Sequence, residues 1–201
     1  MTAAGDSQQF RSAIERFDEA NAKDPTLVDA ESVQQPAALD YSKRMTTWLD
    51  RLYPDASEAL RLAVRAQHLL RWTFARDRYP MTRAGYHQWR TAAGRFSADE
   101  AGKILRDVGY DDATIARVQS LIRKEGLKTD PETQALEDST CLAFLERGFT
   151  EFAQRHDEQK VIGIVQRTWK KMSDHARAAA LGLSLSPDAG RLIGLALAEK
   201  E

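Results

Sequence analysis

Apolar residues recur at spacings of three and four through most of this chain, and no stretch alternates β-branched and polar residues with a period of two. This spacing predicts an all-α fold, a single domain over residues 1–201 with about nine helices joined by short turns. Two segments depart from the pattern. Residues 1–6 are expected to form a loose tail, and residues 23–38, which contain Pro25 and Pro36, are expected to form a long loop.

Capping residues predict where several helices begin. Thr82 is expected to cap a short helix, and Ser97 with Glu100 forms an S-x-x-E capping box that predicts the start of a separate one. Asp130 followed by Pro131 combines a cap with a first-turn proline, which is a strong helix-start signal. We therefore expect helix boundaries at these three places.

The stretch 57–72, SEALRLAVRAQHLLRW, is the most apolar of the predicted helices, and several neighbours are expected to bury it. At about 100° per residue, its polar sector carries Arg61, Arg65, His68 and Trp72 on one face. Arginine holds phosphate oxygens, and neutral imidazole can bind a metal or move a proton. This face is expected to meet either solvent or an anionic ligand.

Two further clusters could carry chemistry. Asp138, in ALEDSTCLAFLE, falls on the line of the apolar stripe, which favours either a buried salt bridge or a functional carboxylate unless the helix start leaves it exposed. The segment YPMTRAGYHQWR places Arg83, Trp89 and Arg90 close together. Such mixtures stack on bases and grip phosphates, or form core aromatics with arginines at the rim. Cys141 is expected to be a small core residue.

Composition narrows the classes of partner. The chain has 29 basic and 30 acidic residues and a net charge of -1, so nucleic acid is not an expected partner. One cysteine excludes an internal disulfide and suits a reducing compartment. The N-terminus lacks the pattern of a signal peptide, and the apolar runs are too short to cross a bilayer. We expect a cytoplasmic protein with no membrane partner.

Four strings together resemble one known family: QHLLRW, YPMTRAGYHQWR, DPETQALEDSTCLAFLE and VQRTWKKMS. They are similar to the family numbered 4202 among the domains of unknown function, and the similarity runs from about Phe10 to the end of the chain. The resemblance implies no particular reaction.

The order of features also resembles the HD superfamily of all-helical, metal-dependent phosphohydrolases, and this resemblance implies an HD-like helical core. YSKRM looks like the first HD motif with Tyr41 in place of a histidine. QHLLRW looks like the second, with His68 retained and Leu69 in place of the aspartate. EDSTCLAFL looks like the last, with Asp138 retained. By this resemblance His68 and Asp138 would be the ligands if a metal binds, and Glu137 would be a spare oxygen ligand.

The leading hypothesis is an HD-like domain that binds a small anionic, phosphorylated ligand without a full metal centre. His68, Glu137 and Asp138 would line the pocket, and His68 and Asp138 would approach within about 6 Å. The side chains expected to bind the ligand are Arg44, Arg65, Trp72, Arg83, Trp89 and Arg90. The runner-up is a metal-dependent phosphohydrolase, and the third reading is a protein-interaction module. A divalent metal is the candidate cofactor, but the hypothesis without any cofactor is favoured.

Overall fold

In the computed structural model, residues 6–30 and 33–198 are described, and within them the chain is mainly helical. This confirms the predicted all-α fold class. The helices of this part are α1 Gln8–Asn21, α2 Ala37–Leu52, α3 Glu58–Ala66, α4 Arg83–Asp107, α5 Asp112–Ile122, α6 Pro131–Ala143, α7 Phe149–Gln154, α8 Glu158–Lys171, α9 Asp174–Leu181 and α10 Pro187–Ala198. Two 3-10 turns (Arg71–Thr73, Arg76–Arg78), a π-helical segment (Phe144–Gly148) and two strands (β1 Leu27–Ala30, β2 Val33–Pro36) complete it.

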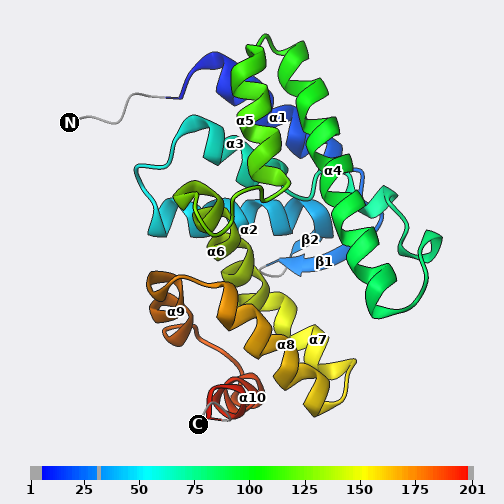
Figure 1. The fold of residues 1–201 in the computed structure, drawn as a ribbon, viewed down its shortest axis with the longest axis vertical. Coiled ribbons are helices and arrows are strands. Elements are labelled where there is room, and N and C mark those ends of the chain that lie inside the picture. Colours follow the sequence, from blue (N-terminus) through cyan, green and yellow to red (C-terminus); the bar gives the residue numbers. More distant parts are fainter. Residues whose placement is uncertain (1–5, 31–32, 199–201) are drawn as a thin grey trace.

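Helix α6 runs through the middle of the molecule and joins its two ends (Figure 1). On one side it packs against α2 and α3, and beyond them α1, α4 and α5 complete the upper part. On the other side it packs against α8 and α9, and α10 covers α8 at the lower end. Side chains from both ends therefore meet around one central helix.

One continuous core fills the space between these helices. Phe17, Met45, Leu62, Leu136 and Phe149, from five different elements, are all fully buried in it. Burying a side chain of this size contributes roughly 1.5–3 kcal/mol. The apolar positions at helical spacing in the sequence supply this core, which is why the fold class could be predicted.

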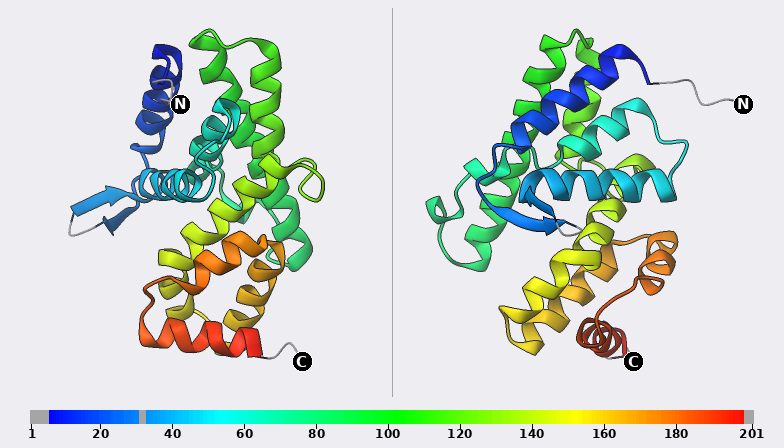
Figure 2. Two further views of the ribbon diagram at one scale, coloured as in Figure 1. Left: turned by 90° about the vertical axis from the view of Figure 1, so that its left-hand side faces the viewer. Right: turned by 180° about the vertical axis from the view of Figure 1, so that it is seen from behind.

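A β-hairpin replaces the long loop that was expected at 23–38. Strands β1 and β2 pair antiparallel, with Leu27 opposite Pro36, and project from the side of α2 (Figure 2). Asp24 fixes the base of the hairpin, since its carboxylate accepts from Thr26 N at 2.9 Å and from Ala38 N at 3.0 Å. Four-residue strands are too short to show a period in the sequence, so the hairpin could not be predicted from it.

The helix predicted over residues 57–72 is shorter than expected. Ser57 caps α3 as expected, accepting from Leu60 N, but the helix ends at Ala66 and the chain turns sharply. Leu70 adopts a left-handed conformation with φ 53°, and a 3-10 turn follows from Arg71. The polar residues of 57–72 therefore do not share one helical face.

Helix α4 is longer than predicted. It runs unbroken over 25 residues from its Thr82 cap, and Ser97 and Glu100 lie inside it. Ser97 is fully buried and donates its hydroxyl to Leu69 O at 3.0 Å. The S-x-x-E pattern is therefore not a cap here, because its serine joins two parts of the core.

The start predicted at Asp130 and Pro131 is confirmed, since Asp130 accepts from Glu132 N and Pro131 opens α6. The helix passes into a π-helical segment at Phe144 before α7 continues it. None of the described helices combines the length and the apolar character that crossing a membrane requires.

Candidate functional site

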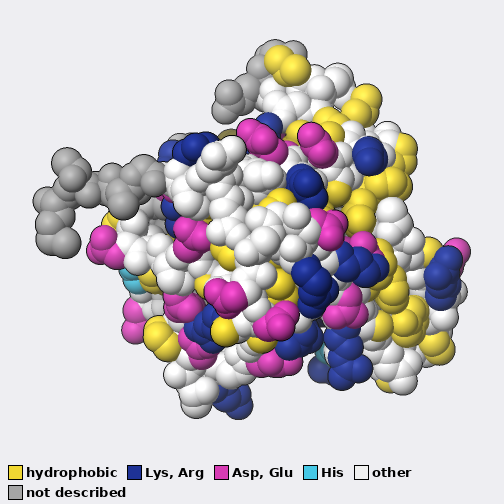
Figure 3. All heavy atoms as spheres, turned by 90° about the horizontal axis from the view of Figure 1, so that it is seen from above, with side chains coloured by type: hydrophobic (Ala, Val, Ile, Leu, Met, Phe, Trp, Pro, Cys, Tyr) yellow, Lys and Arg dark blue, Asp and Glu magenta, His cyan; other side chains and the backbone are white. Residues whose placement is uncertain are grey.

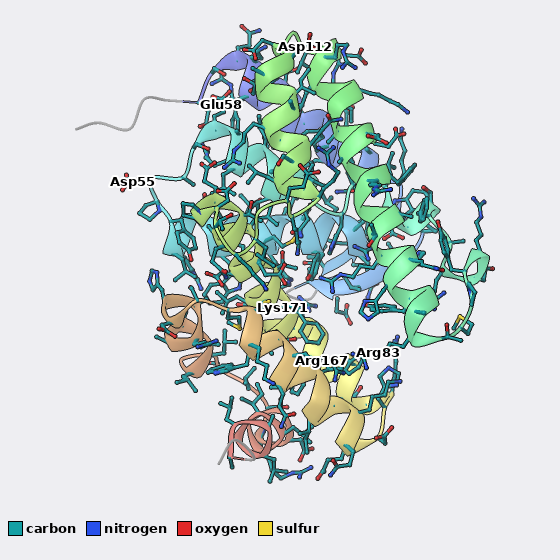
Figure 4. The ribbon with its side chains drawn as sticks, viewed as in Figure 1. Asp55, Glu58, Arg83, Asp112, Arg167 and Lys171 are labelled. Carbon is teal, nitrogen blue, oxygen red and sulfur yellow. The ribbon has the colours of Figure 1, made fainter. Side chains whose placement is uncertain are left out.

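A pocket of about 890 Å³ lies where the upper and lower parts of the molecule meet. Its walls come from α4 on one side and from α7 and α8 on the other, and α6 and the turn after α3 close it between them. Figure 4 shows Arg167 and Lys171 on α8, on the side of the molecule where α4 begins at Arg83. A volume of this size is typical of a small-molecule site.

This cavity, which we call the cationic pocket, is strongly basic. Two of its lining residues are acidic and seven are lysine or arginine, a formal excess of five positive charges in a chain whose net charge is -1. On the face seen from above, by contrast, acidic and basic side chains are interspersed (Figure 3). The lining bases are Arg71, Arg90, Arg95, Arg123, Lys124, Arg167 and Lys171, and the acids are Glu125 and Glu137.

Glu137 lies at the bottom of the cationic pocket and is only 2% exposed. Its carboxylate accepts a hydrogen bond from Lys124 Nζ, and Lys171 Nζ lies 3.4 Å from its other oxygen. Burial raises the pKa of Glu137, but Lys124, Lys171 and Arg90 outweigh it and hold the pKa at about 2. Glu137 is therefore ionised and compensates part of the positive charge.

Not every cation of the pocket has a carboxylate partner. Arg123 pairs with Glu125 at 2.7 Å, but Arg71, Arg90 and Arg167 form no ion pair within the part of the chain that the structure describes. Arg71 stacks on the ring of Trp89, which lies 4.7 Å from its guanidinium carbon. These arginines leave a positive field that an anionic ligand would compensate.

His68 lines the pocket as a neutral imidazole. Its ring stacks on Tyr41 with centroids 5.4 Å apart and planes 10° from parallel. Burial lowers the pKa of His68 well below its ordinary value, and Arg71 and Lys124 lower it further. No hydrogen bond engages the ring nitrogens of His68 among the described residues, so both are available to a ligand.

Tyr41 holds the His68 ring in place. Its hydroxyl donates to Thr140 O on α6 at 3.2 Å, and burial raises its pKa. Thr140 in turn donates to Gln67 Oε1 at 2.6 Å. Tyr41 therefore holds the orientation of His68.

Two strained backbone positions flank the pocket. Leu70 and Lys124, with φ of 53° and 58°, are the non-glycine residues with positive φ over residues 6–30 and 33–198. Such conformations cost on the order of 1–3 kcal/mol and cluster at functional sites. They place Arg71 and the Lys124 side chain in the pocket wall.

Asp138 is not among the residues that line the pocket. It is fully buried and accepts from Tyr53 Oη at 2.6 Å, Ser173 N at 2.9 Å, Ser173 Oγ at 2.6 Å and Gln134 Nε2 at 2.9 Å. Burial, and next the hydrogen bond to Asp138, raise the pKa of Tyr53 to about 12. Asp138 joins α2, α6 and the start of α9. Its predicted approach to His68 stays a prediction.

The two arginines of the polar face predicted for residues 57–72, which we call the arginine stripe, do not lie in the cationic pocket. Arg65 is only 9% exposed and makes a two-pronged ion pair with Asp18, at 2.7 and 2.6 Å. Arg61 pairs with Asp6 at 2.6 Å, which fixes one end of the expected tail, while residues 1–5 lie outside the described part. Neither arginine reaches the pocket, because α3 ends before the chain turns toward it.

Four more predicted ligand residues lie outside the pocket lining. Arg44 pairs with Asp40 one turn earlier on α2, at 2.7 Å. Trp72 and Arg83 are exposed. Trp89 supports the pocket only indirectly, through the arginine that stacks on it. Of the predicted set, the structure brings His68, Glu137 and Arg90 together.

Several lining residues were missed by the sequence reasoning. Lys124 lies in the turn after α5, whereas Arg167 and Lys171 lie four residues apart on α8, so no spacing in the sequence links either element to α4. Tyr86, which precedes Arg90 by one helical turn, belongs to the segment YPMTRAGYHQWR but was not among the predicted ligand residues.

The predicted metal ligands are not assembled into a set. Within the described ranges, no three His, Cys, Asp or Glu side chains come together in a way that could hold a metal ion. Glu137, the spare ligand, is engaged by Lys124 and Lys171. Cys141 is buried, as predicted, and burial raises its pKa to about 12.

Comparison with known proteins places the chain in one family. A family model described as a domain of unknown function, DUF4202, matches residues 11–193. No curated protein and no solved structure matches the chain.

Proposed function

The chain belongs to the DUF4202 family, and from its geometry we propose that the cationic pocket binds a small anionic, phosphorylated ligand. The observation that carries the proposal is the uncompensated charge of the pocket. Arg71, Arg90 and Arg167 line it without a carboxylate partner in the described chain, and Glu137 is already shared by two lysines.

The chemistry of these groups favours phosphate over a single carboxylate. A phosphoryl group carries up to two negative charges and several acceptor oxygens, and the planar fork of arginine matches them. His68 would add a neutral donor or acceptor beside Arg71 and Lys124. The role predicted for His68 and Arg90 is kept in this proposal, and that for Asp138 is not.

No observation favours the two alternative functions. A phosphohydrolase built on His68 and Asp138 would need the oxygens of Asp138, which accept hydrogen bonds from Tyr53 and Ser173. An interaction module built on the arginine stripe would need Arg65, which is paired with Asp18. An HD-like core stays part of the proposal, but the pocket does not depend on it.

Isothermal titration with inorganic pyrophosphate tests this function. The wild type is expected to bind, and Arg90→Gln is expected to weaken binding by roughly tenfold or more, because a charge-assisted hydrogen bond contributes about 1.5–3 kcal/mol. Arg106→Gln is the matched control, since Arg106 is an exposed arginine on the same helix outside the pocket. Absence of binding, or equal weakening by both variants, would contradict the proposal.

A further inference from the structure

One part of the cationic pocket is aromatic rather than charged. Tyr86 lines it from the first turn of α4 and is 44% exposed, an unusual exposure for a large ring. Its neighbours His87 and Trp89 meet it only at an angle, with planes 65° and 40° from parallel. A ring face of Tyr86 is therefore open to a ligand.

Tyr86 and Arg90 offer two different kinds of contact, an aromatic ring and a cation, from the same helix. They are four residues apart on α4, so they lie on one side of the helix, about 6 Å apart along its axis. Arg90 acts deep in the pocket, since its charge lowers the pKa of both His68 and Lys124. One helix thus presents an aromatic face at the mouth and a guanidinium further in.

Part of the wall formed by α7, α8 and the π-helical segment before α7 is apolar. Phe144 of the π-helical segment and Phe152 of α7 line the pocket with their rings edge to face, 6.1 Å between centroids, and Ile164 of α8 also lines it. A phosphoryl group has no favourable contact with such side chains. This part of an 890 Å³ cavity suits an uncharged, flat portion of the ligand.

We infer that the phosphorylated ligand carries a planar aromatic ring, which stacks on Tyr86 while the phosphoryl group lies against Arg90. The inference rests on the proposed function and narrows it to aromatic phosphate esters. Stacking on a tyrosine face favours a ligand with a π-system, whereas an apolar wall favours any hydrocarbon of the same size.

Phenyl phosphate and cyclohexyl phosphate are the matched probes, because they share the phosphoryl group and the number of carbon atoms. Wild type is expected to bind phenyl phosphate at least fivefold more tightly. Tyr86→Leu keeps the apolar bulk but removes the ring, and is expected to abolish this preference. Tyr86→Phe is expected to retain the preference.

The outcomes separate this inference from the proposed function. If pyrophosphate binds but the wild type treats the two esters alike, the aromatic inference is wrong and the phosphate pocket stands. A preference that survives in Tyr86→Leu would also overturn the inference, because the ring would then lie elsewhere. If pyrophosphate and both esters fail to bind, the proposed function is wrong as well.

Discussion

The Lys124 ammonium donates a hydrogen bond to Glu137, although the two residues come from different elements and Glu137 is only 2% exposed. Lys124 reaches it from a left-handed backbone position in the turn after α5. The pair fixes this turn onto α6 at the bottom of the cationic pocket. The shape and the charge of the pocket therefore depend on the same contact.

Removing the negative charge of this pair should cost stability. Glu137→Gln leaves the partly exposed Lys124 and Lys171 beside Arg90 with no anion, and breaking a pair around a buried carboxylate in this way costs about 3–5 kcal/mol. Urea unfolding followed by circular dichroism measures the loss. A loss below about 1 kcal/mol would mean that the pair adds little to the fold.

The same carboxylate predicts a dependence of stability on pH. Its pKa falls from the ordinary value of 4.5 to about 2 in the folded protein, so protonation favours the unfolded chain. The stability that Glu137 contributes is fully present above pH 4.5 and is lost as the pH falls toward 2. The difference in unfolding free energy between wild type and Glu137→Gln should therefore shrink over this window, and a constant difference would contradict the low pKa.

Substitutions of Asp138 and His68 should have different effects, the first mainly on stability and the second mainly on ligand binding. Asp138→Asn places an amide among the donors of Tyr53, Ser173 and Gln134, and is expected to cost about 3 kcal/mol of stability. The affinity of the folded variant for pyrophosphate should lie within about twofold of that of the wild type, because Asp138 does not line the pocket.

His68→Gln should behave in the opposite way. It should cost less than about 1.5 kcal/mol of stability and weaken pyrophosphate binding roughly threefold or more, the value of one neutral hydrogen bond. Urea unfolding and calorimetry on both variants check the contrast. Strong weakening by Asp138→Asn would return that residue to the site.

Two glycines of α4 should respond in opposite directions to alanine. A Cβ at Gly94 meets no atom within 4 Å, so Gly94→Ala should stabilise the helix by about 0.5–1 kcal/mol. A Cβ at Gly102 would collide with the Gln119 side chain, which donates to Ala98 O, so Gly102→Ala should destabilise. Thermal unfolding of both variants checks the signs, and stabilisation by Gly102→Ala would contradict the tight α4–α5 packing.

The sequence predicted the fold class because burial repeats with the period of a helix. Phe10, Ala13 and Phe17 recur at spacings of three and four, and all three are buried. It did not predict where a helix stops inside an apolar run, because the break after Ala66 depends on tertiary contacts such as the hydrogen bond from Leu70 N to Asn21.

The site was only partly predictable for a related reason. Periodicity placed Asp138 on the line of the apolar stripe, and the residue is buried, but the pattern could not reveal which donors from other helices engage it. Glu137 is one residue away and faces the pocket instead. Lys124 and Lys171 reach that pocket from distant segments, which a single sequence does not connect.

A crystal structure of the protein with bound pyrophosphate tests the proposed pocket most directly. We expect the anion in the cationic pocket, with its oxygens within hydrogen-bonding distance of the Arg90 guanidinium and the Lys171 ammonium. Pyrophosphate bound instead at Arg61 or Arg44, with the cationic pocket filled by water alone, would contradict it.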